Sequence, residues 1–147
     1  MRLLFYDKVT EIEKGKSITG VKVFSLSEEF LRHHYTKKAI VPGVVFIEAM
    51  AQLVGWLVIY SHDFNLSAIM SLVEGVRVPP MLRPGFSAAI HGEIVSTSKR
   101  DSLCKARVLV DGEEVASLNR IIFSHFQGMS REDLISRFRY YSGMEPD

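Results

Sequence analysis

Two polar residues stand out in the longest apolar segment of the chain. Glu48 and Gln52 are the only strongly polar residues between Gly43 and Ser61. Residues four apart share one face of a helix, so a helix here places both side chains together. A carboxyl group in apolar surroundings has to be paired, solvated by a cavity or protonated, and a protonated carboxyl is a general acid. The alternative is that Glu48 forms a structural salt bridge or caps another segment.

A histidine and a helix N-terminus accompany this carboxyl group. His33 and His34 lie upstream of Pro42 in a polar segment, and histidine is a base near neutral pH. Gly43 begins the apolar helix, so its backbone N–H and the helix dipole are available to stabilise an oxyanion. Base, acid and oxyanion donor are the groups needed to remove a proton alpha to a carbonyl. An isolated loop histidine is usually just exposed, so this hypothesis depends on the combination.

The elements that position these groups follow from hydrophobic patterning. The apolar stretch from Ala39 to Tyr60 is long enough to suggest a membrane span. Pro42 near its start and Glu48 inside it argue against one, because a charged residue is costly within a bilayer. We therefore expect no membrane span, and a buried helix from about Gly43 to about Ser61.

Alternating apolar and polar residues predict about five antiparallel strands. They are expected at about residues 17–24, 68–78, 86–95, 103–110 and 114–123. Asp111-Gly112 is a hairpin signal between the last two. Ser130 to Asp133 resembles a capping box and opens an apolar pattern of helical period, which predicts a short amphipathic helix packed on the sheet or on a partner. We expect a main domain over residues 1–126 and a helical extension over 127–147.

Composition limits the classes of protein. The chain has 147 residues with 18 Lys+Arg and 17 Asp+Glu, and this balance excludes a strongly basic nucleic-acid binder. The single cysteine, Cys104, excludes an intramolecular disulfide and a Cys-based zinc site, and its place in an alternating strand makes it a core residue. The apolar run at the N-terminus stops at Asp7, too early for a signal peptide, so we expect a cytoplasmic protein. His62, His91 and His125 show no ligand spacing and are expected to have no functional role.

The segment from His34 to Gln52 resembles the active-site segment of the β-hydroxyacyl-acyl carrier protein dehydratases. Their pattern is a histidine, a loop ending in Pro-Gly-Val, and a helix carrying Glu-Ala-Met-Ala-Gln. Here His34 precedes Gly43 by 9 residues and Glu48 by 14, as the family pattern requires, and residues 48–52 match the helix motif at every position. The similarity extends from about Phe5 to about Phe123.

This resemblance implies an α+β hotdog fold, in which an antiparallel sheet wraps around the central helix. It also implies at least a homodimer, with the histidine from one chain and the acid from the other in each active site. His34 would remove the alpha proton of a 3-hydroxyacyl thioester, Glu48 would protonate the departing hydroxyl, and the Gly43 N–H would hold the thioester oxygen. Gln52 would orient Glu48 or a water. The resemblance implies no metal or redox cofactor, because the substrate arrives on the phosphopantetheine arm of an acyl carrier protein.

The loop around the histidine departs from the family pattern. His33 replaces a glycine, Tyr35-Thr36-Lys37 replace Phe-Pro-Gly, and Ala39 replaces a proline. Such changes alter loop stiffness and allowed backbone angles, and they leave open both ordinary fatty-acid synthesis and a specialised route to aryl polyenes or other polyunsaturated chains. Basic side chains near the expected entrance would attract an acidic carrier protein, although a solvated loop is the plain alternative. These residues are Arg32, Lys37, Lys38, Arg77 and Arg83.

Two other functions compete with a dehydratase. A hotdog thioesterase needs a carboxylate to activate water but not the His34–Glu48 arrangement, so the intact spacing argues against it. A catalytically silent subunit that binds acyl chains or pairs with a second hotdog protein is favoured by the altered loop. The retained His34 and Glu48 oppose it, because such a subunit has no chemical use for them.

Overall fold

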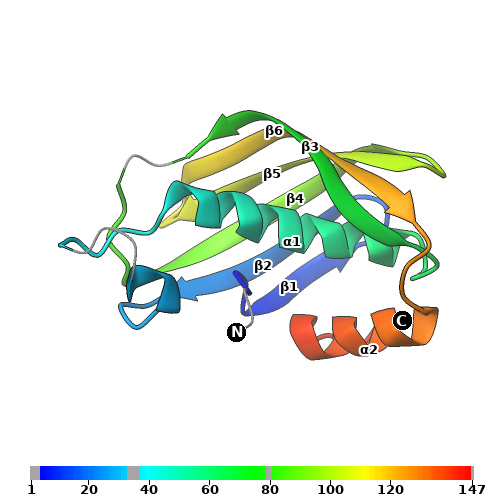
Figure 1. The fold of residues 1–147 in the computed structure, drawn as a ribbon, viewed down its shortest axis with the longest axis horizontal. Helices are drawn as coiled ribbons and strands as arrows, with labels where there is room; N and C mark the ends of the chain where they lie inside the picture. The colour runs from blue at the N-terminus through cyan, green and yellow to red at the C-terminus, as the bar shows by residue number, and fades with distance from the viewer. Residues whose placement is uncertain (1–3, 33–36, 79–80, 147) are drawn as a thin grey trace.

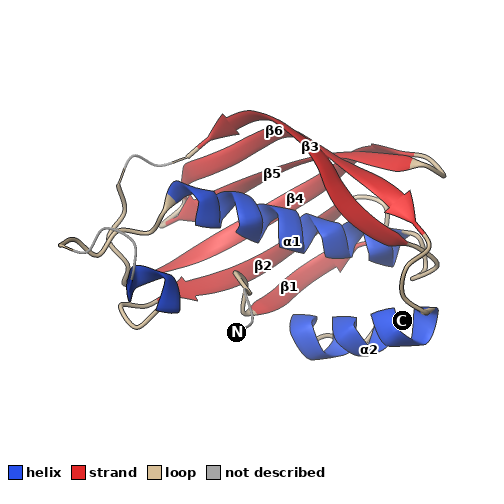
Figure 2. Cartoon of the chain, viewed as in Figure 1, coloured by secondary structure: helices blue, strands red, loops and turns tan. Residues whose placement is uncertain are grey.

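The computed structural model describes residues 4–32, 37–78 and 81–146. In this part of the chain a long helix, α1, lies across one face of a curved antiparallel sheet of six strands (Figures 1 and 2). A second helix, α2, lies beside the C-terminal half of α1. The elements are β1 (Lys8–Glu13), β2 (Ser17–Phe24), the 3-10 helix η1 (Glu29–Arg32), α1 (Gly43–Ser61), β3 (Ser67–Arg77), β4 (Phe86–Thr97), β5 (Asp101–Val110), β6 (Glu113–Phe126) and α2 (Arg131–Ser142).

The sheet has the strand order β1-β2-β4-β5-β6-β3, so β3 forms one edge although it precedes β4 in the chain. The five predicted strands are confirmed, with ends that differ by at most a few residues. The predicted turn between β5 and β6 is confirmed too: Asp111 and Gly112 have φ angles of 52° and 79°, the left-handed conformation that a tight hairpin requires. The antiparallel hotdog-like architecture expected from the sequence is therefore present.

The helix α1 begins and ends at the predicted residues and forms the centre of the core. Its length and composition would suit a membrane span, but ten of its side chains are buried within the fold. The helix lies so close to the sheet that glycine is needed beneath it, since a Cβ at Gly92 of β4 would lie 2.3 Å from Val54 Cγ2 of α1. A Cβ at Gly20 would lie 2.9 Å from Leu53 Cδ1. The apolar segment is thus the core helix that the charge of Glu48 had suggested.

The expectation of about five strands was wrong by one, because alternation did not reveal β1. The pairing of β1 with β2 shifts register between Val9 and Glu11. Such a β-bulge adds one residue to a strand, so Val9 and Ile12 turn toward the core although they are three positions apart. A search for period two therefore fails at this strand.

The predicted C-terminal helix is confirmed, and it packs both on the edge of the sheet at β1 and on the last turns of α1. Ser130 Oγ accepts a hydrogen bond from the Asp133 backbone N–H at 3.2 Å, which is the expected N-terminal cap. Phe138 is fully buried in a small cluster with Ile59, Phe64 and Leu134. This cluster holds α2 against the last turns of α1.

Candidate active site

Glu48 and Gln52 lie together on the side of α1 that faces away from the sheet. Their positions four residues apart bring the side chains into contact, and Gln52 Nε2 donates a hydrogen bond to Glu48 Oε1 at 3.0 Å. Both side chains are partly buried. The predicted pairing of these two residues is therefore present, and it places an amide donor on the carboxyl group.

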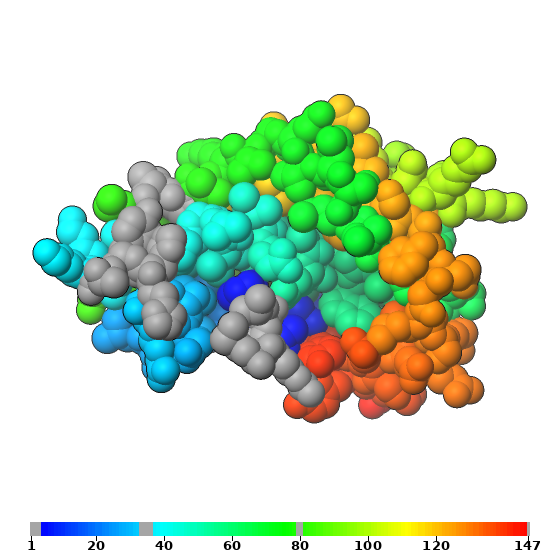
Figure 3. Space-filling view, viewed as in Figure 1, coloured from blue at the N-terminus to red at the C-terminus, as the bar shows by residue number. Residues whose placement is uncertain are grey.

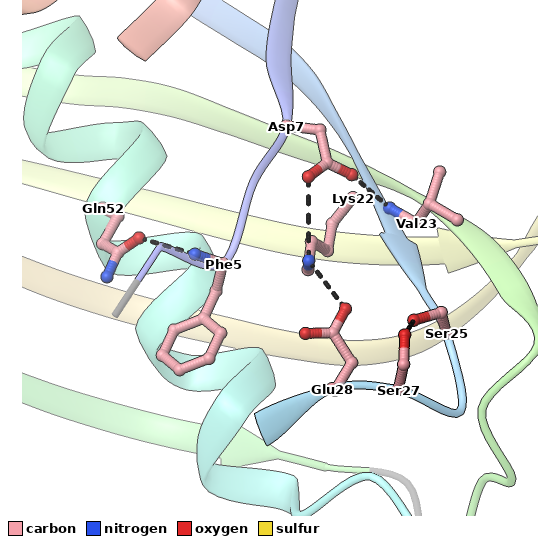
Figure 4. A network of polar contacts seen from close by, with 8 residues as sticks. All are labelled: Phe5, Asp7, Lys22, Val23, Ser25, Ser27, Glu28 and Gln52. Carbon is pink, nitrogen blue, oxygen red and sulfur yellow. Dashed lines mark hydrogen bonds and ion pairs between the residues drawn. The ribbon is translucent and has the colours of Figure 1, made fainter. Parts of the chain in front are cut away.

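A residue of the N-terminal segment binds the other end of the Gln52 amide. The Phe5 backbone N–H donates to Gln52 Oε1 at 3.0 Å. The amide of Gln52 thus bridges Phe5 and Glu48, with its oxygen toward the first and its nitrogen toward the second (Figure 4 shows the contact with Phe5). Sequence analysis did not identify Phe5 as a site residue, because 47 positions separate it from Gln52.

Glu48 and Gln52 line a groove of about 510 Å³. In the space-filling view α1 forms its floor, β3 lies above it, and the N-terminal segment and α2 lie below (Figure 3). The groove has the size of a small-molecule site and is lined mainly by apolar and aromatic residues. They are Leu4, Tyr6, Glu48, Ala51, Gln52, Gly55, Trp56, Ile59, Ala68, Ile69, Met70, Phe123, Arg137 and Tyr141.

Among these residues only Glu48 and Gln52 were predicted as site residues, and those that were missed include Tyr6, Trp56, Arg137 and Tyr141. The helical period could have revealed Trp56, which lies eight positions after Glu48 on the same face. The indole Nε1 of Trp56 donates to Tyr6 Oη at 2.8 Å. Burial raises the pKa of Tyr6 to about 12, with the Trp56 hydrogen bond opposing the shift and Tyr141 adding to it. The Tyr6 phenol is therefore neutral at physiological pH.

The N-terminus of α1 lies at the end of β3. Pro42 precedes the helix and provides no side-chain cap for the first backbone N–H groups. A Cβ at Gly43 would lie 3.0 Å from Val78 Cγ2, so the backbone there passes close to the residue that follows β3. Gly43 therefore occupies the predicted position at the positive end of the helix dipole. His34 lies outside the described residues, and its pairing with a carboxyl group stays a prediction.

Three of the five predicted basic residues lie together. Arg32, Lys37 and Lys38 line a second groove, of about 490 Å³, along with Leu26, Ser27, Glu28, Leu31 and Ala39. Arg77 is on β3, where its Nη1 lies 3.6 Å from Glu114 Oε2. Arg83 is exposed in the segment that follows residue 80. This segment is linked to the residues before α1 by a hydrogen bond from the Val41 N–H to Leu82 O, 2.9 Å long. The structure thus engages Arg77 in an ion pair across the sheet rather than in the groove with the other three.

The remaining reactive side chains lie away from this groove. Cys104 is fully buried, and burial raises the pKa of its thiol to about 12, so it is the predicted core residue. His62 and His125, which looked scattered in the sequence, have ring centroids 4.8 Å apart at the C-terminal end of α1. Ser102 Oγ and Thr97 Oγ1 connect the two rings through hydrogen bonds of 2.7 to 2.8 Å.

Comparison with known protein families and curated sequences gives consistent matches. The model of the FabA-like domain matches residues 1–119. A 3-hydroxyacyl-[acyl-carrier-protein] dehydratase FabZ of Thiobacillus denitrificans is 34% identical over 117 residues, which are 77% of this chain and 81% of that protein. The protein of the same name from Pediococcus pentosaceus is 30% identical over 114 residues, 77% of this chain and 76% of that protein. The family match ends before α2.

Solved structures are similar in fold at low sequence identity. The smu.793 protein of Streptococcus mutans, bound to acetyl CoA, superposes with a TM-score of 0.68 at 15% identity, covering 88% of this chain and 96% of that one. The thioesterase HI1161 of Haemophilus influenzae superposes with a TM-score of 0.65 at 6% identity, covering 83% of this chain and 79% of that one. At such identities the likeness concerns the hotdog fold alone.

Proposed function

Because the chain belongs to the FabA-like family of β-hydroxyacyl-acyl carrier protein dehydratases, we propose that it removes water from a 3-hydroxyacyl thioester. The product is the trans-2-enoyl thioester, and the acyl group is delivered by an acyl carrier protein. The observation that carries the proposal is the carboxyl group of Glu48, held by the Gln52 amide within an otherwise largely apolar groove. A carboxylic acid in such a place is suited to proton transfer to a bound substrate.

The proposed reaction is an elimination in which every group has one task. His34 takes the proton alpha to the thioester carbonyl, and the electron pair of that C–H bond forms the new double bond. The bond between the β-carbon and its hydroxyl breaks, and Glu48 gives its proton to the hydroxyl so that water leaves. The Gly43 N–H, at the start of α1, stabilises the charge that develops on the thioester oxygen. The proposed reaction needs no redox cofactor, since elimination of water involves no net oxidation, and it needs no metal, since His34, Glu48 and the Gly43 N–H supply the base, the acid and the oxyanion donor.

We further propose that two copies associate through the free edge of β3. Ile69, Leu72 and Val76 on this edge strand have exposed fractions of 58%, 38% and 47%. An exposed apolar edge strand is a template for pairing with another chain, and a homodimer would cover it. In the proposed assembly His34 of one copy acts with Glu48 of the other. A second hotdog protein in place of an identical copy would appear as a hetero-oligomer in cell extracts.

The carrier protein is proposed to dock on the groove lined by Arg32, Lys37 and Lys38. Basic side chains attract an acidic carrier and increase its rate of association. We place the reaction in the cytoplasm and in fatty-acid biosynthesis, where acyl carrier protein holds the growing chain. The alternative is a specialised role in making aryl polyenes, which is tested with conjugated acyl substrates.

The proposal is tested by following the conjugated enoyl thioester by absorbance. The substrates are 3-hydroxybutyryl, medium-chain and conjugated 3-hydroxyacyl groups on carrier protein. We expect turnover by the natural protein and a loss of roughly 10²- to 10⁴-fold in Glu48→Gln and in His34→Ala. Unchanged dehydration in either variant would refute the mechanism. Release of free thiol without enoyl product would identify a thioesterase, and a folded protein without activity on any substrate would favour the silent subunit.

A further inference from the structure

The N-terminal arm, residues 4–7, leaves the sheet at Asp7 and crosses to α1. The Asp7 backbone N–H donates to Val21 O at 2.7 Å, beside the first residue pair of the β1–β2 ladder. Its carboxylate then accepts a hydrogen bond from the Val23 N–H, with Asp7 Oδ2 at 2.7 Å. Asp7 is thus the last residue of the arm that β2 holds, and beyond it the arm runs toward α1 (Figure 4).

A buried lysine anchors the arm from the other side. The side chain of Lys22 is only 8% exposed, and its Nζ lies 2.9 Å from Glu28 Oε1 and 3.7 Å from Asp7 Oδ1. A buried ammonium group is tolerated only when carboxylates pair with it, so Lys22 draws both partners to one point. Figure 4 shows Asp7 and Glu28 converging on Lys22 from two different segments. One of these segments is the arm, and the other leads into η1.

At its far end the arm contacts both α1 and η1 through Phe5. The Phe5 backbone N–H donates to Gln52 Oε1, and its ring lies 6.1 Å from that of Phe30, between centroids. Phe5 therefore has a defined position relative to the helix that carries Glu48. The ring contact and the Lys22 ion pairs both hold the arm in the place where this backbone hydrogen bond forms.

The chemistry of the amide makes this contact directional. A backbone N–H is only a donor, so Gln52 has to turn its oxygen toward Phe5. The NH₂ of the same amide then points to Glu48 and acts as a donor there. Glu48 Oε1 must be an acceptor, and a proton on this carboxyl group belongs on Oε2.

We propose that the N-terminal arm is a positioning element for the acid. The Phe5 N–H fixes the orientation of the Gln52 amide, the amide holds Glu48 Oε1 as an acceptor, and Oε2 is left to carry the transferred proton. Lys22 keeps the arm in register by pairing with Asp7. Phe5 and Lys22 are positioning residues in this scheme. Its catalytic consequence rests on the proposed dehydratase function, whereas the anchoring of the arm does not.

The first test replaces the N–H itself. Proline at position 5 removes the donor, and leucine at position 5 keeps it, so Phe5→Leu is the matched control for loss of the ring. We expect kcat of Phe5→Pro to fall roughly 3- to 10-fold below that of Phe5→Leu, the size of one hydrogen bond, with similar KM values. Equal kcat values in the two variants would overturn the proposal. A rise in KM alone would overturn it too, since that would indicate weaker substrate binding.

The second test requires no turnover. Hydrogen exchange of the Phe5 backbone amide, followed by NMR in the full-length protein, reports its hydrogen bond directly. We expect the Phe5 amide to be protected in the natural protein. Its protection factor should fall at least tenfold in Gln52→Met and by a smaller factor in Lys22→Met. Exchange of Phe5 at the rate of an exposed amide in the natural protein would overturn the proposal. If the protein shows no dehydration but Phe5 is protected, the proposed function fails while the anchoring of the arm holds.

Discussion

The indole nitrogen of Trp56 donates a hydrogen bond to the phenol oxygen of Tyr6, 2.8 Å away, and so joins α1 to the N-terminal arm at the wall of the groove. Tyr6 is 4% exposed, so little water is available to replace the bond. The two rings therefore form part of the groove wall and help to fix the position of the arm that binds Gln52.

We expect Tyr6→Phe to lower the free energy of unfolding by about 1 to 2 kcal/mol, because the Trp56 N–H loses its acceptor in a partly buried place. Urea denaturation of both proteins measures this difference. Trp56→Phe removes the hydrogen-bond donor. In the Trp56→Phe background, Tyr6→Phe should therefore lower the free energy of unfolding by less than it does in the natural protein. An equal cost in both backgrounds would show that the hydrogen bond contributes nothing.

The docking of α2 should depend on Phe138. Its ring is fully buried, with centroids 5.6 Å from Trp56, 5.7 Å from Tyr60 and 5.4 Å from Phe64. Phe138→Ala is expected to destabilise the protein by about 3 to 5 kcal/mol, and amide exchange in residues 131–142 should accelerate first. Tyr140→Ala is the control, because this neighbouring side chain is 73% exposed and its loss should change stability by less than about 0.5 kcal/mol. Similar losses in both variants would contradict the packing role.

Tyr141 should limit the length of the acyl chain. It reaches the groove from α2, beyond the residues that the family match covers. Tyr141→Ala is expected to raise kcat/KM for long chains relative to short ones by several-fold, because each additional methylene group that becomes buried contributes about 0.8 kcal/mol. Tyr141→Phe keeps the ring and should preserve the natural preference. Competition between carrier-bound chains of two lengths measures the ratio, and an unchanged ratio in Tyr141→Ala would exclude this role.

Stability should fall in mildly acidic solution because of His62. Burial, then the nearby His125, lowers the pKa of His62 below its ordinary value, with Asp63 opposing the shift. The unfolded chain then binds more protons than the folded one just below that ordinary value, about pH 6.5, so stability decreases as pH falls through this range. Urea midpoints between about pH 7.5 and 5 should show the decrease, and His62→Asn should reduce it. An identical pH dependence in the variant would assign the effect to other groups.

Two glycine substitutions should have opposite effects on stability. Gly92→Ala places a Cβ 2.3 Å from Val54 Cγ2 beneath α1, and we expect this overpacking to cost about 1 to 3 kcal/mol. At Gly55, within α1, the new Cβ would lie 3.5 Å from Phe123 Cε1, an ordinary contact. Gly55→Ala should therefore stabilise the helix by about 0.5 to 1 kcal/mol. Thermal denaturation distinguishes the two, and a stabilised Gly92→Ala would mean that α1 shifts readily on the sheet.

Local physical causes explain what could be predicted from the sequence. The bounds of α1 follow from an apolar run after Pro42 that only Glu48 and Gln52 interrupt, and the start of α2 follows from the Ser130 cap. Gly112 allowed the β5–β6 turn to be recognised because glycine adopts the left-handed conformation without strain. Glu48 and Gln52 could be placed on one face because helical spacing depends on no other part of the chain. The strand β1 could not be recognised in this way, since its bulge disrupts the local period.

The sequence by itself therefore determined the order of the main elements, the family, and the placing of the Glu48 carboxyl beside the Gln52 amide. Only the tertiary structure decided what surrounds them. The Phe5 N–H reaches Gln52 across 47 positions, and Tyr141 of α2 lines the same groove as Tyr6. Such contacts arise where separate segments bury their apolar faces against one core, and no local pattern of residue types specifies which backbone group then meets which side chain.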